Sequence, residues 1–535
     1  MMKKLFWVTF LLVHFHLPSA GSPQQEISAT RAIATNQQEI GIPYLRNYAP
    51  KEYGADVQNW TIVQDQRGVM YFGNNSGVLE YDGVSWRLIP TANNSAVRSL
   101  AVGDDGKIYV GAQSELGYLS PDSVGQLHYV SLRDSVPAEY RDFADIAKIY
   151  ATTAGVYFQA LDRFFLWSNN RMRVWKPATP FHLSFVVRDR LYIRQPGIGL
   201  MQMMENSLHL VPDGEKFAEA RIYLMLPYDD HNILIGTREQ GLFLYDGAAA
   251  KPFPTEVDAL LLESQIYHGA VLSNGHFALA TLRGGVAIID KAGKLQQLLD
   301  KAAGIQNDNV KFLFPDRQGG LWLALDNGLT RVEAPSPFSI YDERTGLKGA
   351  VESILKHQGT LYVATRLGVF YLQPRLVGPA GNPLVQQPRF MPVSGIATQS
   401  WSLLSTGKTL LAAAGDGVYQ IQNHQATLIR KSDRHSYVLL RSQIDTTRIY
   451  IGLENGLVAL RFPPNSRNQW IDEGKVNGID TEVRSIVEMN DGILWLGTRS
   501  QGIVRVDISA GFSTGPKIEN INSRYGFPVE PGWVI

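Results

Sequence analysis

The sequence predicts an all-β protein made of tandem β-propellers with four-stranded blades. Eleven times along the chain, a short run of β-forming residues leads to a small residue and then to a glycine turn. The mean spacing of these copies is about 42 residues, which is the length of one four-stranded blade. Two prolines in three residues, Pro335 and Pro337, follow the seventh copy. We therefore expect a complete seven-bladed propeller followed by a second, incomplete one.

One small residue in each copy marks the repeat. The clearest copies carry glycine there, as in Trp495-Leu496-Gly497 followed by Gly502-Ile503. Larger residues occupy the position in two of the weaker copies. In chain order the marked positions are Gly73, Gly111, Gln159, Arg194, Gly236, Ala280, Ala324, Ala364, Ala413, Gly452 and Gly497.

The first copy of the repeat shows the order of strands and turns that is expected of one blade. Strands are expected at residues 60–64, 69–72, 78–81 and 85–89. The turn Asp65-Gln66-Arg67-Gly68 joins the first two strands, because its glycine supplies a positive φ angle. Asp82-Gly83 indicates a hairpin between the last two. The aromatic residue of the second strand, such as Tyr71, is expected to pack between blades rather than to bind a ligand.

The distribution of prolines and of repeat copies along the chain suggests four regions. Residues 1–21 are expected to be a signal peptide and residues 22–42 a flexible leader, with the first propeller at 43–332 and the second at 338–535. Prolines at 335 and 337 exclude a paired central strand there, which favours a domain junction. The second region holds about four to five blades, and the residues from Tyr525 resemble the approach to another blade. We therefore expect the chain to be a fragment of something longer.

The N-terminus and the composition favour an exported protein. Lys3 and Lys4 precede an apolar stretch and then Pro18-Ser19-Ala20-Gly21, the order typical of a secretory signal. An uncleaved anchor stays open as the alternative. The absence of cysteine excludes disulfides and thiolate chemistry, and it fits a bacterial periplasm. With 50 basic and 50 acidic residues, nothing in the net charge indicates nucleic acid.

The repeat resembles that of a known family. The stretch from Asp491 to Ile503, and a variant of it from Asp316 to Leu329, is similar to the two-component regulator propeller repeat. The stretch from Val332 to Phe338, followed by Gly346-Leu347-Lys348-Gly349, is similar to the join between paired propellers in such sensors. The likeness extends over nearly everything from Ile42 onward.

The resemblance implies a role in signal input. Members of that family carry two seven-bladed propellers as a periplasmic sensor, usually followed by a β-sandwich, a membrane helix and a cytoplasmic output module. The output is a histidine kinase, a diguanylate cyclase, a phosphatase or a DNA-binding regulator, so the full-length protein would be anchored in the inner membrane. The resemblance also implies a homodimer formed through the full-length signalling protein.

No motif in the chain points to catalysis, to a metal or to a cofactor. The histidines lack His-x-x-x-His spacing, Gly197-Ile198-Gly199 lacks the third glycine of a dinucleotide site, and no nucleophile elbow occurs. Carboxylates from different blades could still converge in space, as a glycoside hydrolase requires. We therefore expect no catalytic residue, no metal and no cofactor, and keep a polysaccharide lyase or hydrolase as an alternative.

The candidate ligand-binding residues lie where ligands usually bind a propeller. Four loops after the second strand carry an arginine, whose planar fork suits carboxylates and sugar acids. Residues at the start of the innermost strands should border the same opening of the propeller. Ion pairs with neighbouring acids such as Glu239 or Asp480 are the competing interpretation. The candidates are Arg238, Arg283, Arg366, Arg499, Trp60, Arg98, Asn309, Trp401 and Arg484.

We therefore expect a non-enzymatic extracytoplasmic module that senses a small molecule or a carbohydrate. In the most specific form of this hypothesis, the ligand is acidic. A pure protein-interaction scaffold is the third alternative. One smaller expectation concerns residues 294–303, where Leu295, Leu298, Leu299 and Ala302 are spaced for one face of a short helix.

Overall fold

The structure, a computed structural model, describes residues 40–177, 179–204, 207–373, 388–462, 470–509, 511–512 and 515–521. Strands in these residues form eleven four-stranded antiparallel sheets. The predicted all-β fold of four-stranded blades is confirmed. The predicted signal peptide, residues 22–39 of the expected leader and the last residues from 522 onward lie outside the described part.

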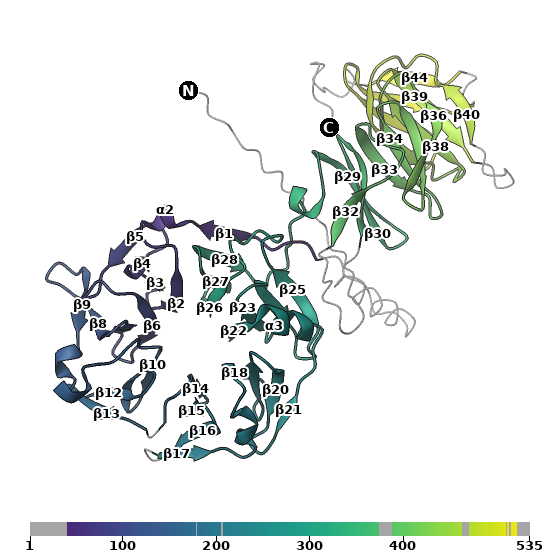
Figure 1. The fold of residues 1–535 in the computed structure, drawn as a ribbon. Helices are drawn as coiled ribbons and strands as arrows, with labels where there is room; N and C mark the ends of the chain where they lie inside the picture. Colours follow the sequence, from purple (N-terminus) through teal and green to yellow (C-terminus); the bar gives the residue numbers. More distant parts are fainter. Residues whose placement is uncertain are drawn as a thin grey trace.

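Seven of the sheets stand around a common centre (Figure 1). The first contains β2 (Asn59–Gln64), β3 (Met70–Asn74), β4 (Gly77–Tyr81) and β5 (Trp86–Ile89). The second contains β6 (Val97–Val102), β7 (Ile108–Ala112), β8 (Glu115–Pro121) and β9 (Leu127–Ser131). The third contains β10 (Lys148–Thr152), β11 (Gly155–Gln159), β12 (Phe164–Ser168) and β13 (Arg171–Trp175).

The next three sheets follow the same order from the centre outward. The fourth contains β14 (Ser184–Val187), β15 (Arg190–Gln195), β16 (Gly199–Met204) and β17 (Ser207–Leu210). The fifth contains β18 (Ile222–Pro227), β19 (Ile233–Thr237), β20 (Gly241–Tyr245) and β21 (Ala250–Pro252). The sixth contains β22 (Ile266–Val271), β23 (Phe277–Thr281), β24 (Val286–Ile289) and β25 (Leu295–Leu299).

The seventh sheet joins the two ends of this region. It contains β26 (Val310–Pro315), β27 (Gly320–Leu325) and β28 (Leu329–Glu333), and its outer strand is β1 (Leu45–Tyr48) from the start of the chain. Figure 1 shows β1, in purple, beside the teal β28. Asn59 Nδ2 donates to the Gly328 carbonyl at 3.1 Å, which ties the first sheet to the seventh. The ring is therefore closed by pairing and by side chains.

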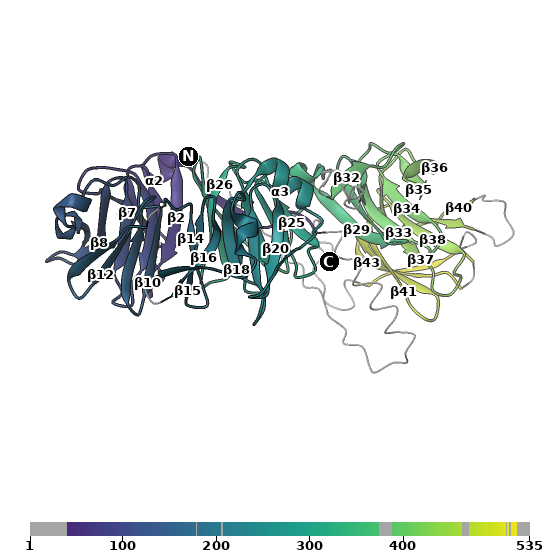
Figure 2. The ribbon, with the colours of Figure 1, turned by 60° about the horizontal axis from the view of Figure 1, so that its bottom comes forward.

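The other four sheets follow one another along the chain. They contain β29 (Val351–His357) to β32 (Arg389–Pro392), with β30 (Thr360–Thr365) and β31 (Gly368–Gln373) between; then β33 (Ser400–Ser405), β34 (Leu410–Ala414), β35 (Gly417–Gln422) and β36 (Gln425–Lys431). Then come β37 (Ser436–Arg441), β38 (Arg448–Leu453), β39 (Gly456–Arg461) and β40 (Ile471–Lys475); and β41 (Val483–Glu488), β42 (Ile493–Thr498), β43 (Gly502–Asp507) and β44 (Lys517–Asn520). Figure 2 shows them beside the ring. We interpret the two groups as the two propellers, 43–332 and from 338 onward.

The described helices are short. They are α2 (Pro50–Tyr53), α3 (Asp258–Ser264) and the 3-10 turns Arg133–Ser135, Ala138–Tyr140, Gly214–Phe217 and Glu343–Thr345. Within the described ranges, no helix is both long and apolar enough to cross a bilayer. The helix expected within residues 294–303 is wrong, because residues 295–299 form β25 and pair with β24. Its apolar residues reach the core through strand pairing, which overrides their helical spacing.

The small residue of the repeat is explained by the contact between neighbouring sheets. A Cβ on Gly73 would lie 2.6 Å from Thr61 Cγ2 in its own sheet and 2.9 Å from the Val97 carbonyl oxygen in the next. Where a larger residue occupies this position, its side chain forms a hydrogen bond across the contact between neighbouring sheets. Gln159 accepts from the Ser184 N–H at 3.2 Å, and Arg194 Nε donates to the Phe217 carbonyl at 3.1 Å. The two weak copies of the repeat are therefore polar versions of the same contact.

The acidic residue of the repeated turn holds the aromatic residue of the second strand. Asp316 accepts from Trp322 Nε1 at 3.0 Å and from Arg331 Nε at 2.8 Å. Asp105 accepts from the Tyr109 hydroxyl at 3.1 Å in the same way. Trp322 and Tyr109 are buried, which agrees with the predicted packing role of the aromatic residue.

Candidate functional site: the central cavity of the first propeller

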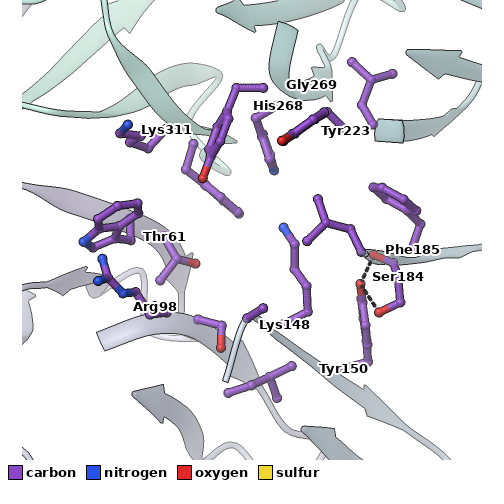
Figure 3. Close-up of a pocket in the computed structure, with 18 of the residues that line it drawn as sticks. Thr61, Arg98, Lys148, Tyr150, Ser184, Phe185, Tyr223, His268, Gly269 and Lys311 are labelled. Atoms are coloured by element: carbon purple, nitrogen blue, oxygen red, sulfur yellow. Dashed lines mark hydrogen bonds between the residues drawn. The ribbon is translucent and has the colours of Figure 1, made fainter. Parts of the chain in front are cut away.

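The innermost strands of the seven-sheet ring surround a cavity of about 480 Å³. Its lining comes from β2, β6, β10, β14, β18, β22 and β26, and also from Asp145, Ala147 and Leu183 just before two of these strands. Figure 3 shows these side chains directed at an open centre. The volume falls within the range of sites that bind small molecules. We call this space the central cavity.

A recurring β-bulge shapes the rim of the cavity. In nine of the eleven sheets, the pairing of the innermost strand with its neighbour shifts by one residue near the start of the strand. A bulge changes the direction of the extra side chain. In the ring, these bulged residues all line the cavity, and they are Trp60, Arg98, Tyr223, Tyr267 and Lys311.

Cations lie over aromatic rings at this rim. The Arg98 guanidinium is 3.9 Å from the centre of the Trp60 ring, and that of Arg238 is 4.0 Å from the Tyr223 ring. The Lys311 amine is 5.4 Å from the rings of both Trp60 and Tyr267. Such contacts hold the charges and the flat rings in place. The rim therefore presents ordered aromatic faces with cationic groups between them.

The next layer of the cavity carries Lys148, His268 and Phe312. Each lies opposite the small residue of its repeat, in the pairs Lys148 with Gln159, His268 with Ala280 and Phe312 with Ala324. Figure 3 shows the Lys148 amine and the His268 ring reaching toward the centre from opposite sides. The His268 ring also packs on Phe312, with ring centres 4.0 Å apart.

Burial sets the charge state of this layer. Burial lowers the pKa of Lys148 to about 8. Burial, together with the nearby charge of Lys148, lowers the pKa of His268 well below its ordinary value. At neutral pH, Lys148 is therefore mainly charged and His268 is neutral.

Tyr150 and Ser184 form a fixed polar wall. The Tyr150 hydroxyl donates to the Ser184 carbonyl, and the Ser184 hydroxyl, which lies 3.2 Å from the Tyr150 hydroxyl, donates to Gln159 Oε1. Burial raises the pKa of Tyr150 above its ordinary value, so this hydroxyl keeps its proton. These groups hydrogen-bond one another and shape the cavity wall.

The structure brings several predicted ligand-binding residues to the ring's centre. Trp60 and Arg98 line the cavity, and Arg238 covers Tyr223 at its rim. Asn309 lies just before β26, and its buried Oδ1 has no hydrogen-bond partner among the described residues. Arg283 is exposed in the loop after β23.

In the second group, the predicted arginines meet neighbouring acids. Arg366 Nε lies 2.9 Å from Glu352 Oε1. Arg499 and Arg484 both pair with Glu482, with Arg499 Nη1 at 3.2 Å. These are ion pairs of the kind that the competing interpretation expected. The acid beside Arg499 is Glu482, however, and not Asp480.

Trp401 in the second group belongs to an aromatic cluster. Its ring lies edge-on to Tyr437, with centres 4.9 Å apart, and Arg484 covers the other ring of this pair at 3.6 Å. The bulge thus places Trp401, Tyr437 and Arg484 as it places their counterparts in the ring. The ligand-binding role expected of Trp401 and Arg484 therefore stays a prediction.

Sequence analysis missed Lys148, His268, Tyr223, Tyr267 and Lys311. The signal that could have found them is the repeat itself, since aligning the copies on the small residue of the second strand also aligns the innermost strands. Tyr223, Tyr267 and Lys311 then fall on the position of Trp60 and Arg98. Lys148 and His268 fall one residue later, where the strand faces the cavity.

The fold is similar to that of solved extracellular domains. A domain from B. thetaiotaomicron, described as part of a hybrid two component system, superimposes with a TM-score of 0.63 at 16% identity, over 91% of this chain and 67% of that one. This chain has the fold of that extracellular domain. The predicted resemblance to two-component regulator propellers is thereby confirmed at the level of the fold.

More distant matches include other propellers. The extracellular domain of a one component system from B. thetaiotaomicron aligns at 14% identity with a TM-score of 0.42, over 90% of this chain and 73% of that one. The WD40 β-propeller domain of Doa1 aligns at 12% identity with a TM-score of 0.42, over 57% of this chain and 99% of that one. No family model matches the sequence, and no curated protein matches it significantly.

Proposed function

We propose that this chain is the extracytoplasmic, ligand-sensing input region of a bacterial signal-transduction protein, and that the ligand binds in the central cavity of the first propeller. The ligand is a small molecule or a carbohydrate, and the chain itself is not an enzyme. The observation that carries the proposal is the central cavity, because the bulge recurs in five sheets of the ring and places aromatic and cationic side chains at the rim of the cavity.

Two further observations support a sensory role. The TM-score of 0.63 is with the extracellular domain of a signalling protein. In addition, the tyrosine and serine hydroxyls of the wall are occupied by hydrogen bonds to each other, which suits a rigid binding surface. A serine or tyrosine that acted as a nucleophile would need a general base beside its hydroxyl. Here the two hydroxyls contact each other instead.

A blocked cavity tests the proposal. Ala147 lines the cavity, so Ala147→Trp should fill it, whereas Ala248→Trp adds the same side chain at an exposed hairpin. A panel of sugars, sugar acids and small organic acids is screened by thermal shift. At a hundredfold excess over Kd, a ligand stabilises the native state by about 2.7 kcal/mol. We expect a shift in the wild type and in Ala248→Trp that is lost in Ala147→Trp.

The outcomes separate the three function classes. Binding that survives in a folded Ala147→Trp variant would place the ligand elsewhere and refute the cavity. Release of oligosaccharides from a polysaccharide panel, followed by mass spectrometry, would favour the lyase or hydrolase. Binding of no compound in the panel would favour the protein-interaction scaffold. Circular dichroism confirms that both variants fold, and Ala147→Met is the milder substitute.

A further inference from the structure

We infer that the central cavity binds a small, ring-shaped monoanion, whose carboxylate is held between the Lys148 amine and the His268 Nε2–H. This inference rests on the proposed function and names its ligand class. The five observations behind it are an unpaired amine, a defined histidine tautomer, the balance of charge in the cavity, the flat rings of the rim and the volume.

The Lys148 amine faces the cavity without a protein partner. Among the described residues, no carboxylate lies within ion-pair distance of it and no acceptor bonds it. Its nearest recorded neighbour is the Phe312 ring, whose centre is 5.8 Å from Nζ. The half-buried ammonium loses part of its hydration and has no protein acceptor in exchange, which is costly. An anion in the cavity supplies that acceptor.

The His268 ring offers a second donor at the same place. Its Nδ1 lies 3.2 Å from the Leu313 backbone N–H, and accepts that hydrogen bond. A neutral imidazole that accepts at Nδ1 carries its proton on Nε2. His268 is therefore a neutral N–H donor, and Figure 3 shows its ring directed at the centre that Lys148 also reaches. Two donors and no acceptor suit a carboxylate, which only accepts.

The balance of charge indicates a single negative charge on the ligand. Arg98 Nε pairs with Asp145 Oδ2 at 3.1 Å, and the Lys311 amine lies 3.6 Å from Asp326 Oδ1. These pairs neutralise two of the three cations that line the cavity. Lys148 is the third, so one positive charge is left over among the residues that line the cavity, while Arg238 lies outside this lining, over the Tyr223 ring. A carboxylate matches it, whereas a phosphate dianion would carry one charge too many.

The rim and the volume indicate a ring as the body of the ligand. Trp60, Tyr223 and Tyr267 present flat faces at the rim. Such faces pack against the apolar face of a sugar ring or against an aromatic ring. A cavity of about 480 Å³ accommodates a compound of one or two rings. A uronic acid and an aromatic carboxylate share this chemistry, and the test distinguishes them.

Matched pairs of compounds test the inference by calorimetry. The probes are galacturonate against galactose, glucuronate against glucose, and benzoate against benzyl alcohol. We expect at least one acid to bind the wild type about tenfold or more tightly than its neutral partner, because a charged hydrogen bond contributes at least one decade. The uronates and benzoate then show which kind of ring is preferred.

Substitutions at Lys148 complete the test. Lys148→Met keeps most of the side-chain volume and should abolish the preference for the acid, while Lys51→Met, at an exposed site in α2, should retain it. Lys148→Gln serves if Lys148→Met does not fold. The inference is overturned if no acid binds more tightly than its neutral partner, or if a folded Lys148 variant keeps the preference. Neutral sugars that bind the wild type but not Ala147→Trp would uphold the proposed function and reject the anion.

Discussion

Tyr48 provides the sharpest test of how the ring closes around the cavity. It is the last residue of β1, only 4% exposed, and its ring lies 5.2 Å from that of Trp322 and 5.6 Å from that of Tyr81. It therefore joins the start of the chain to both the seventh and the first sheets. Truncating a buried aromatic side chain costs about 3–5 kcal/mol. We expect Tyr48→Ala to lose that much stability.

The expected change in melting temperature follows from the size of the ring. Unfolding about 290 residues gives an entropy of roughly 0.6 kcal/mol per kelvin, so Tyr48→Ala should lower the Tm by about 5–8 °C. Differential scanning calorimetry measures the shift. Tyr44→Ala is the matched control, because Tyr44 is 61% exposed and should change stability by about 0.5 kcal/mol or less. Equal shifts for the two variants would refute closure by β1.

Three further predictions concern the turn, the contact between sheets and the cavity. Asp316→Ala should cost about 1–3 kcal/mol in urea unfolding, because it leaves the buried Trp322 Nε1–H without its acceptor and leaves Arg331 paired with Glu333 alone, whereas the exposed Asp491→Ala should cost little. Gly73→Ala should cost about 1–3 kcal/mol by overpacking, and a neutral result would contradict the explanation of the small residue. Anion affinity should be constant below the Lys148 pKa of about 8 and fall about tenfold per pH unit above it, since the amine loses its charge. Lys148→Met should remove this pH dependence in calorimetry at pH 6–10.

The sequence alone determined the repeat and much of its local chemistry. The spacing of the small residues predicted four-stranded sheets, and the Asp-x-x-Gly turns predicted where the first two strands join. Trp60 and Arg98, which the sequence placed near the opening of the propeller, line the central cavity, and their role in binding stays a prediction. These features are readable because each depends on residues within one repeat of about 42 residues. The short helix expected within residues 294–303 failed because apolar spacing is ambiguous over ten residues, and pairing with β24 decided it.

Only the tertiary structure decided how the ring closes and what fills its centre. β1 pairs with β28, nearly the whole length of the ring away in sequence, and no local pattern marks residues 45–48 as the outer strand of the seventh sheet. Lys148 and His268 likewise lie on different sheets, and each reads in sequence as an isolated polar residue in an apolar run. They become a pair because the closed ring turns every innermost strand toward one axis, so that residues far apart in the chain share one small cavity.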